Sequence, residues 1–107
     1  MNKLYFVETN GGYMTVATSD DGRACYMWQD GMEENYPSSS PDWDESEASE
    51  RKTIAENWLR SIAEWNSFDD LYANCDTSSG FTGVYTAAEF AEDLESGASS
   101  ILAEIDF

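Results

Sequence analysis

Carboxylates outnumber basic side chains by 22 to 5 in this chain of 107 residues, so its net charge is −17 at pH 7. Such a charge repels itself, so a compact state needs enough buried apolar area to offset both the repulsion and the lost chain entropy. Acidic chains that stay disordered are poor in aromatic residues, whereas this one has four Trp, six Tyr and five Phe. We therefore expect residues 1–107 to form one folded domain.

The first third of the chain predicts an antiparallel β-meander. Lys3–Thr9 has the composition of a strand, and Asn10–Gly12 suits a hairpin turn. Alternation over Tyr13–Thr18 indicates a second strand. A third strand over Arg23–Trp28 follows the turn residues Ser19–Gly22.

An acidic loop is predicted from about residue 29 to residue 45, where the alternation is lost. Asp30-Gly31 and the run from Pro37 to Pro41 are typical of loops. A short fourth strand over Met32–Tyr36 is the alternative for part of this segment.

A long helix is predicted from Asp44 or Ser46 to Asn66, because apolar side chains recur there three and four residues apart. Two Glu–Arg pairs on its outer side have the i,i+4 order that favours an ion pair. The expected stripe is Ala48, Ala55, Trp58, Leu59 and Ile62 with the aliphatic stem of Arg51, and the pairs are Glu47–Arg51 and Glu56–Arg60.

Two shorter helices are expected next. Ser67–Asp70 can cap a helix that ends near Asn74, and Thr86 with Glu89 has the spacing of a capping box for another. The second helix also has a Tyr85–Phe90 hydrophobic staple, a buried stripe of Phe90, Ala91 and Leu94, and Gly97 as its terminator.

A final strand is predicted because Ile101, Ala103, Ile105 and Phe107 alternate with their neighbours. The order of elements indicates an α+β fold. It consists of an N-terminal antiparallel β-meander of three or four strands, two or three helices packed on one face, and a C-terminal strand.

The residues present disfavour several kinds of chemistry. The chain has no histidine, the commonest general base and metal ligand. Cys25 and Cys75 fit no metal or redox spacing, and we expect reduced thiols, one or both buried. Asp42–Glu47 begins like a calcium loop, but Glu47 stands where Gly is required and Thr53 where the bidentate Glu belongs. We expect a non-enzymatic protein without a cofactor or a metal site.

The negative charge is concentrated in two parts of the chain. Residues 30–50 contain eight acidic residues and residues 67–107 contain nine, and neither part contains a basic residue. Carboxylates on adjacent helical turns lie about 5–6 Å apart, comparable in scale to successive phosphates of a nucleic-acid strand. The candidate partner-binding residues are Asp30, Glu33, Glu34, Tyr36, Asp42, Trp43, Asp44, Glu45, Glu47, Glu50, Glu89, Glu92, Asp93 and Glu95.

Several of these residues have two interpretations. Glu89, Glu92 and Asp93 can stabilise the start of a helix through its dipole without any partner. Trp43, which lies between two aspartates, either anchors a partner or folds back to cover the core. Tyr36 has the same two interpretations.

The charge also indicates the kind of partner. Nucleic acids and anionic membranes are polyanions, so we expect no direct binding to either. A basic protein surface would be attracted, and the association would weaken as salt rises. Residues 1–10 contain no targeting pattern and no segment approaches the ~20 apolar residues of a membrane span, so we expect a cytoplasmic protein.

The base-free acidic blocks 30–50 and 67–107, the small size and the many aromatic residues resemble small acidic inhibitors made by bacteriophages, including anti-CRISPR and anti-restriction proteins. The resemblance implies evasion of host defence in the bacterial cytoplasm. The inhibitor would mimic nucleic acid and occupy the basic DNA- or RNA-binding surface of a protein or ribonucleoprotein complex. Inhibitors of this kind also act by locking conformations or inducing dimers. The alternative function is an immunity-type or adaptor protein that binds a different basic protein.

Overall fold

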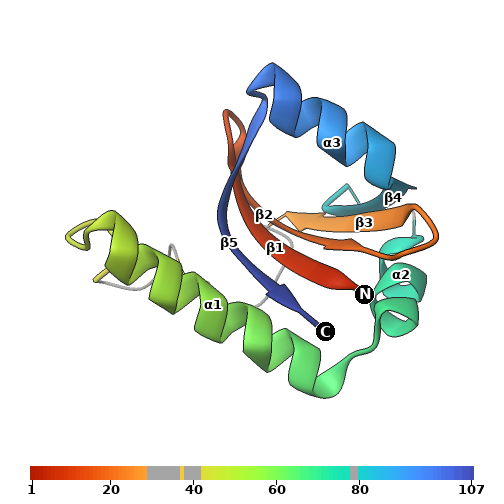
Figure 1. The fold of residues 1–107 in the computed structure, drawn as a ribbon, viewed down its shortest axis with the longest axis horizontal. Helices are drawn as coiled ribbons and strands as arrows, with labels where there is room; N and C mark the ends of the chain where they lie inside the picture. The colour runs from red at the N-terminus through yellow and green to blue at the C-terminus, as the bar shows by residue number, and fades with distance from the viewer. Residues whose placement is uncertain (29–36, 38–41, 78–79) are drawn as a thin grey trace.

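Within the residues that the structure describes (1–28, 37, 42–77 and 80–107), a five-stranded antiparallel sheet carries three helices. Figure 1 shows this computed structural model. The strands are β1 (Lys3–Thr9), β2 (Gly12–Thr18), β3 (Arg23–Trp28), β4 (Thr82–Thr86) and β5 (Ser99–Asp106), and the helices are α1 (Ala48–Trp65), α2 (Phe68–Cys75) and α3 (Ala87–Ser96). The sequence prediction of an α+β fold is confirmed.

The predicted N-terminal meander is present, since β1, β2 and β3 pair as consecutive antiparallel neighbours. Each of its two turns contains a glycine with positive φ, 128° at Gly12 and 88° at Gly22, which other residues rarely adopt. The fourth strand considered over Met32–Tyr36 lies outside the described residues, as does most of the predicted loop 29–45.

Strand β4 was not predicted from the sequence. It pairs with β3 at one edge while β5 pairs with β1 at the other, so the strand order is β4-β3-β2-β1-β5. Gly83 interrupts the strand pattern of β4, yet it is required there because a Cβ atom would collide with the Tyr26 ring. Tyr85 and Thr86, whose spacing identified the start of a helix, also complete this strand.

The side chains of the sheet form two hydrophobic cores, one on each face. Leu4, Phe6 and Met27 belong to the larger core, which α1 and α2 cover. Val7 points the other way and packs with Phe90 of α3. Two helices therefore share one face, within the predicted range, whereas α3 lies on the opposite face (Figure 1). Because α3 connects the two edge strands β4 and β5, it has to cross the sheet.

Helix α1 begins later than the sequence pattern indicates. Ala55, Leu59 and Ile62 are buried as expected, but Ala48 is the first helical residue and is exposed, so it does not extend the buried stripe. Residues 42–45 form a turn instead of helix because the Trp43 side chain is inserted into the core.

The predicted cap of α2 and the predicted capping box of α3 are both present, and the cap of α2 is a capping box as well. In α2, the Ser67 hydroxyl accepts from the Asp70 amide at 3.1 Å and the Asp70 carboxylate accepts from the Ser67 amide at 3.0 Å. Thr86 and Glu89 exchange the same two bonds at the start of α3. Gly97 ends α3 in the left-handed conformation, with a φ of 81°.

Fewer side chains of α3 are buried than predicted. Phe90 is buried and its ring centroid lies 6.3 Å from that of Tyr85, as the predicted staple requires. Leu94 is half-buried, but Ala91 is exposed, so the prediction that Ala91 belongs to the buried stripe is wrong. The smaller core beneath α3 offers room for little more than one large side chain of the helix.

Strand β5 confirms the predicted C-terminal strand, but its alternation is interrupted. Phe6 pairs with Ala103 and Val7 with Ile101, which leaves Leu102 as an extra residue, as in a β-bulge. Leu102 consequently packs against the larger core, while Ile101 is 38% exposed.

Candidate functional site

The fourteen predicted partner-binding residues fall into three groups in the structure. Four of them lie outside the described residues, namely Asp30, Glu33, Glu34 and Tyr36. Six lie in residues 42–50, and four lie on α3. We call residues 42–50 the acidic segment; its carboxylates belong to Asp42, Asp44, Glu45, Glu47 and Glu50, all of them exposed.

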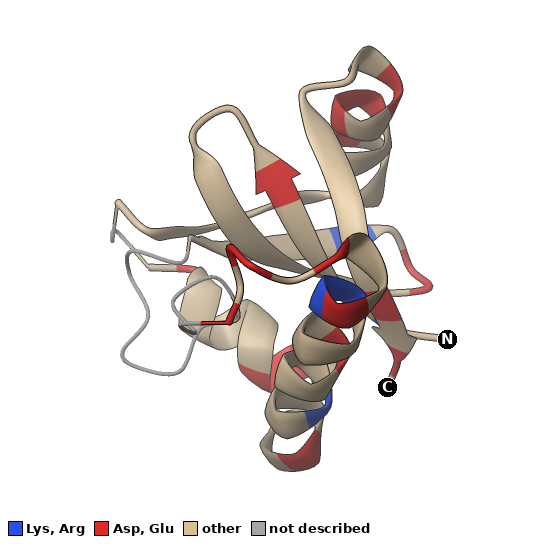
Figure 2. Ribbon diagram, turned by 90° about the vertical axis from the view of Figure 1, so that its left-hand side faces the viewer, with Lys and Arg blue, Asp and Glu red and all other residues tan. Residues whose placement is uncertain are grey.

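The structure does not bring the two described groups together on one face of the sheet. The acidic segment leads into α1, which covers the larger core, whereas α3 covers the smaller core on the other face. Figure 2 shows acidic residues on both helices, separated by the sheet. A partner surface that contacts one group through a flat interface therefore does not automatically contact the other.

Trp43 lies in the core and is only 1% exposed, so its prediction as a partner-binding side chain is wrong. Its ring makes edge contacts with Phe6 and Tyr13 at centroid distances of 5.9 and 5.8 Å. The indole N–H donates to the Tyr13 hydroxyl at 3.4 Å, which satisfies its one polar group. The alternative interpretation, that Trp43 covers the core, describes the structure.

Arg51 fixes the acidic segment from the first turns of α1. Its Nε donates to the Trp43 carbonyl at 2.8 Å and its Nη2 donates to the Asp44 carbonyl at 3.3 Å. The guanidinium also lies over the Trp43 ring, 5.3 Å from the centroid. The predicted Glu47–Arg51 ion pair is absent among the described residues, because the guanidinium is engaged with the backbone and the ring instead.

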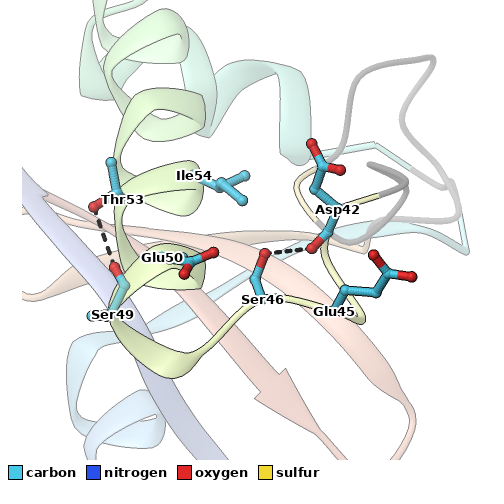
Figure 3. A pocket seen from close by; sticks show the side chains of 7 residues that line it. All are labelled: Asp42, Glu45, Ser46, Ser49, Glu50, Thr53 and Ile54. Atoms are coloured by element: carbon cyan, nitrogen blue, oxygen red, sulfur yellow. Dashed lines mark hydrogen bonds between the residues drawn. The ribbon is translucent and has the colours of Figure 1, made fainter.

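A pocket of about 650 Å³ lies between the acidic segment and α1. Figure 3 shows its carboxylates, hydroxyls and the apolar Ile54. Its lining residues are Asp42, Glu45, Ser46, Ser49, Glu50, Thr53 and Ile54. Such a mixture suits the head group of an Arg or Lys side chain, which needs acceptors at its tip and an apolar surface along its stem.

No metal centre is formed in the part of the chain that the structure describes. It contains no group of three or more His, Cys, Asp or Glu side chains arranged to hold a metal ion. Residues 42–45 form a turn, Glu47 is the N-cap residue and α1 begins at Ala48.

The acids of α3 are tied more closely to the structure of the helix itself. The Glu89 carboxylate accepts from the Thr86 amide at 3.3 Å and from its hydroxyl at 3.2 Å. Asp93 is half-buried, and its charge adds to the effect of burial in raising the pKa of Tyr85. Glu92 and Glu95 are exposed.

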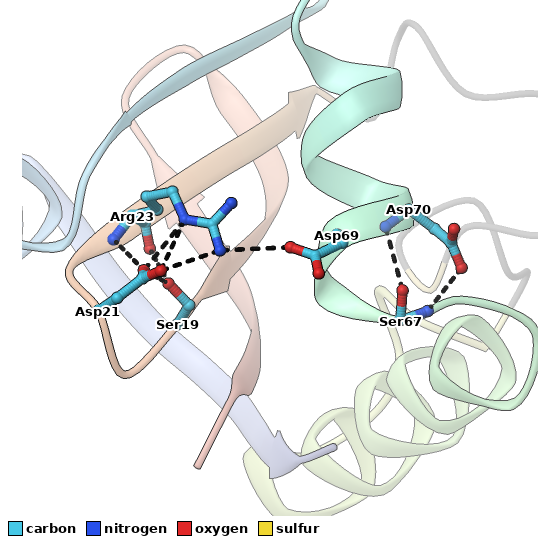
Figure 4. Close-up of polar contacts among 6 residues, drawn as sticks. All are labelled: Ser19, Asp21, Arg23, Ser67, Asp69 and Asp70. Carbon is cyan, nitrogen blue, oxygen red and sulfur yellow. Dashed lines mark hydrogen bonds and ion pairs between the residues drawn. The ribbon is translucent and has the colours of Figure 1, made fainter.

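Arg23, Lys3 and Arg60 form ion pairs with acids outside the acidic segment. Arg23 contacts Asp21 at 2.9 Å and Asp69 at 3.2 Å, which joins the β2–β3 turn to α2 (Figure 4). Lys3 reaches Asp106 at 3.1 Å, and Arg60 forms the predicted pair with Glu56 at 3.6 Å. These three cations are therefore engaged away from the acidic segment.

The two cysteines are free thiols and both are buried, as predicted. The neighbouring Cys75 sulfur and burial raise the pKa of the Cys25 thiol. Burial also removes both sulfurs from contact with solvent, so neither presents a nucleophile at the surface.

Sequence reasoning did not identify two features of this region. The pocket hydroxyls of Ser46, Ser49 and Thr53 recur three and four residues apart, a spacing that could have placed them on one side of the predicted helix, although Ser46 precedes α1 in the structure. Trp65 was also missed, because it lies three residues after Ile62, in line with the apolar stripe, and yet its ring is 80% exposed.

Comparison with protein-family models, with curated proteins and with solved structures found no match. Among the described residues, no helix combines the length and the apolar character needed to cross a membrane.

Proposed function

We propose that this protein is a non-enzymatic inhibitor that binds the basic nucleic-acid-binding surface of a bacterial defence complex through its acidic segment. The observation that carries the proposal is an excess of exposed carboxylates on a segment held firmly by the core. Within the described residues, no basic side chain forms an ion pair with Asp44, Glu45, Glu47 or Glu50. These charges contribute repulsion to the fold and are available to a cationic partner.

The way the segment is held supports mimicry of nucleic acid. Trp43 and Arg51 fix its backbone from the core side, so the carboxylates project from an ordered scaffold. Glu47 is the N-cap residue of α1 and Glu50 lies in its first turn, so two exposed carboxylates stand close together at the start of the helix. A groove lined by Arg and Lys would meet these negative charges, and little chain entropy would be lost on binding.

The overall charge supports a protein partner with a basic surface. A net charge of −17 steers the chain toward cations and away from polyanions such as nucleic acid and anionic lipid. Binding would exclude nucleic acid from the partner by occupying the same groove, without any chemical step by this protein.

The experiment compares two pairs of charge reversals with the same change in net charge. D44K/E45K changes two exposed acids of the acidic segment, and E92K/E95K changes two exposed acids of α3. Wild-type protein captures partners from a bacterial extract, and each captured protein is purified for affinity and nucleic-acid competition measurements.

We expect D44K/E45K to weaken binding on the order of 100-fold. Each reversal replaces an attraction to the basic partner by a repulsion, and we expect each to cost about 1.4 kcal/mol, which is a tenfold loss of affinity. E92K/E95K should keep affinity within about threefold, since α3 lies on the opposite face of the sheet and exposed charges outside the contact contribute little. Equal losses for both variants would refute the assignment to the acidic segment. A partner that binds this protein and nucleic acid at the same time would refute mimicry and favour the immunity-type or adaptor function.

A further inference from the structure

Trp65 is the most exposed large apolar side chain among the described residues, with 80% of its surface in water. The other tryptophans of the α1 region are used by the fold. Trp43 is buried, and the half-buried Trp58 donates its indole N–H to the Thr15 hydroxyl at 3.3 Å. The fold therefore gives a structural role to these two rings and leaves the Trp65 ring in solvent.

The position of Trp65 relates it to the pocket at the other end of α1. Glu50, Ile54, Trp58, Ser61 and Trp65 follow one another at spacings of three and four residues, so they lie along one flank of the helix. Glu50 and Ile54 line the pocket beside the acidic segment. At 1.5 Å per residue, Trp65 lies about 22 Å further along the same flank.

The surroundings of Trp65 favour a cation. The last turn of α1 contains no basic residue, so the negative end of the helix dipole is not compensated there. The neighbouring Glu64 adds an exposed carboxylate. A guanidinium that stacks on an indole ring gains cation–π attraction, and Arg does so more readily than Lys.

The same contact already occurs inside this protein. The Arg51 guanidinium lies 5.3 Å from the centroid of the Trp43 ring, and Arg23 lies 5.1 Å from that of Phe68 and 5.0 Å from that of Tyr72. Each of these rings thus receives an Arg from its own chain. The Trp65 ring is exposed at the surface, where an Arg of another protein could make the same kind of contact.

We propose that Trp65 is an anchor for the basic partner, which stacks an Arg side chain on the exposed indole. The contact would run along one flank of α1, with the carboxylates of the acidic segment at one end and Trp65 at the other. This inference rests on the proposed function, because the basic partner that binds the carboxylates of the acidic segment is also the source of the Arg side chain that stacks on Trp65. Trp is among the residues that contribute most to the affinity of protein interfaces.

The test uses the full chain labelled with ¹⁵N and titrated with nona-arginine. The indole resonance of Trp65 is assigned by its loss in W65F. We expect the Trp65 indole and the amides of the acidic segment to shift together, while the buried Trp43 indole stays in place. The affinity of W65A for nona-arginine should fall about tenfold and W65F should recover most of it, because Phe keeps a ring for the cation.

F81A is the matched control, since Phe81 is an exposed aromatic residue at 48% that does not belong to α1. It should bind nona-arginine like the wild type. W65A should unfold at the same temperature as the wild type because its side chain is already in solvent.

The outcomes separate the two proposals. Shifts in the acidic segment with a stationary Trp65 indole would overturn the anchor and leave the proposed function intact. Shifts confined to α3, or no shift anywhere, would overturn both. An equal loss of affinity in F81A and W65A would also overturn the anchor, because the effect would not be specific to α1.

Discussion

The acidic segment and α3 carry the same kind of side chain on opposite faces of one sheet, but the carboxylates relate differently to the fold. At the start of α3, Glu89 completes a capping box with Thr86. At the start of α1, Glu47 occupies the N-cap position without any side-chain cap bond. Glu89 thus stabilises the helix that carries it, whereas the Glu47 side chain forms no such cap.

This difference shows how composition alone can mislead about a highly acidic chain. Both regions contribute to the net charge of −17. Only the contacts of each carboxylate in the folded protein show whether it stabilises a helix, as Glu89 does, or is available to a partner. The acidic segment is held by the buried Trp43 ring and by the hydrogen bonds that Arg51 donates to its backbone. Variants that affect one region and spare the other can test this distinction.

The largest effect is expected from W43A. Removing a buried Trp that contacts Phe6 and Tyr13 should lower the free energy of unfolding by about 3–5 kcal/mol and release the acidic segment from the core. Urea denaturation measures the change. W65A is the matched control, and its effect should stay within about 0.5 kcal/mol. Equal stability of the two variants would contradict the assignment of Trp43 to the core.

A smaller effect, confined to the other region, is expected from T86A. Loss of the cap that joins Thr86 to Glu89 should lower the free energy of unfolding by about 1 kcal/mol. Partner affinity should stay the same, because α3 is not the proposed contact. A clear drop in affinity with T86A would show that the comparison between the two regions is wrong.

The smallest effect concerns an acid paired within the fold. Hydrogen bonds from Arg23 and then Ser19 lower the pKa of Asp21 to about 2, below its ordinary value of 3.8. A carboxyl whose pKa is lowered by folding stabilises the folded state above pH 4, and this contribution is lost as the pH falls from about 4 to 2. D21N should therefore be slightly less stable than the wild type at pH 7.

Thermal unfolding of D21N and the wild type between pH 7 and pH 2 checks this expectation. The difference between the two proteins should shrink as Asp21 takes up a proton, and most of it should be lost by pH 2. Because the Asp21 carboxylate is exposed, the effect is small throughout. A difference that does not depend on pH would contradict the assigned pairing with Arg23.

Local sequence patterns predicted much of the fold. Alternation identified β1, β2 and β3, the apolar spacing of Ala55, Leu59 and Ile62 identified α1, and the two capping boxes fixed the starts of α2 and α3. These signals depend on neighbours in the chain and are therefore readable without the tertiary structure.

Features that depend on distant contacts were not readable. Strand β4 was missed because Gly83 interrupts its strand pattern. A glycine is required at this position by the Tyr26 side chain on the neighbouring strand, a contact that the local sequence does not reveal. The bulge at Leu102 arises from pairing between β5 and β1. The two aspartates beside Trp43 suggested exposure as strongly as burial, and only the packing against Phe6 decides between the two.

The central claim is that the carboxylates of the acidic segment make the partner contact, and the salt dependence of affinity tests it most directly. Affinity of the wild type for the captured partner should fall roughly ten- to hundredfold between about 50 and 200 mM salt. D44N/E45N should show a shallower slope and E92N/E95N the slope of the wild type. An affinity that does not change with salt, or a slope that only E92N/E95N reduces, would contradict the claim.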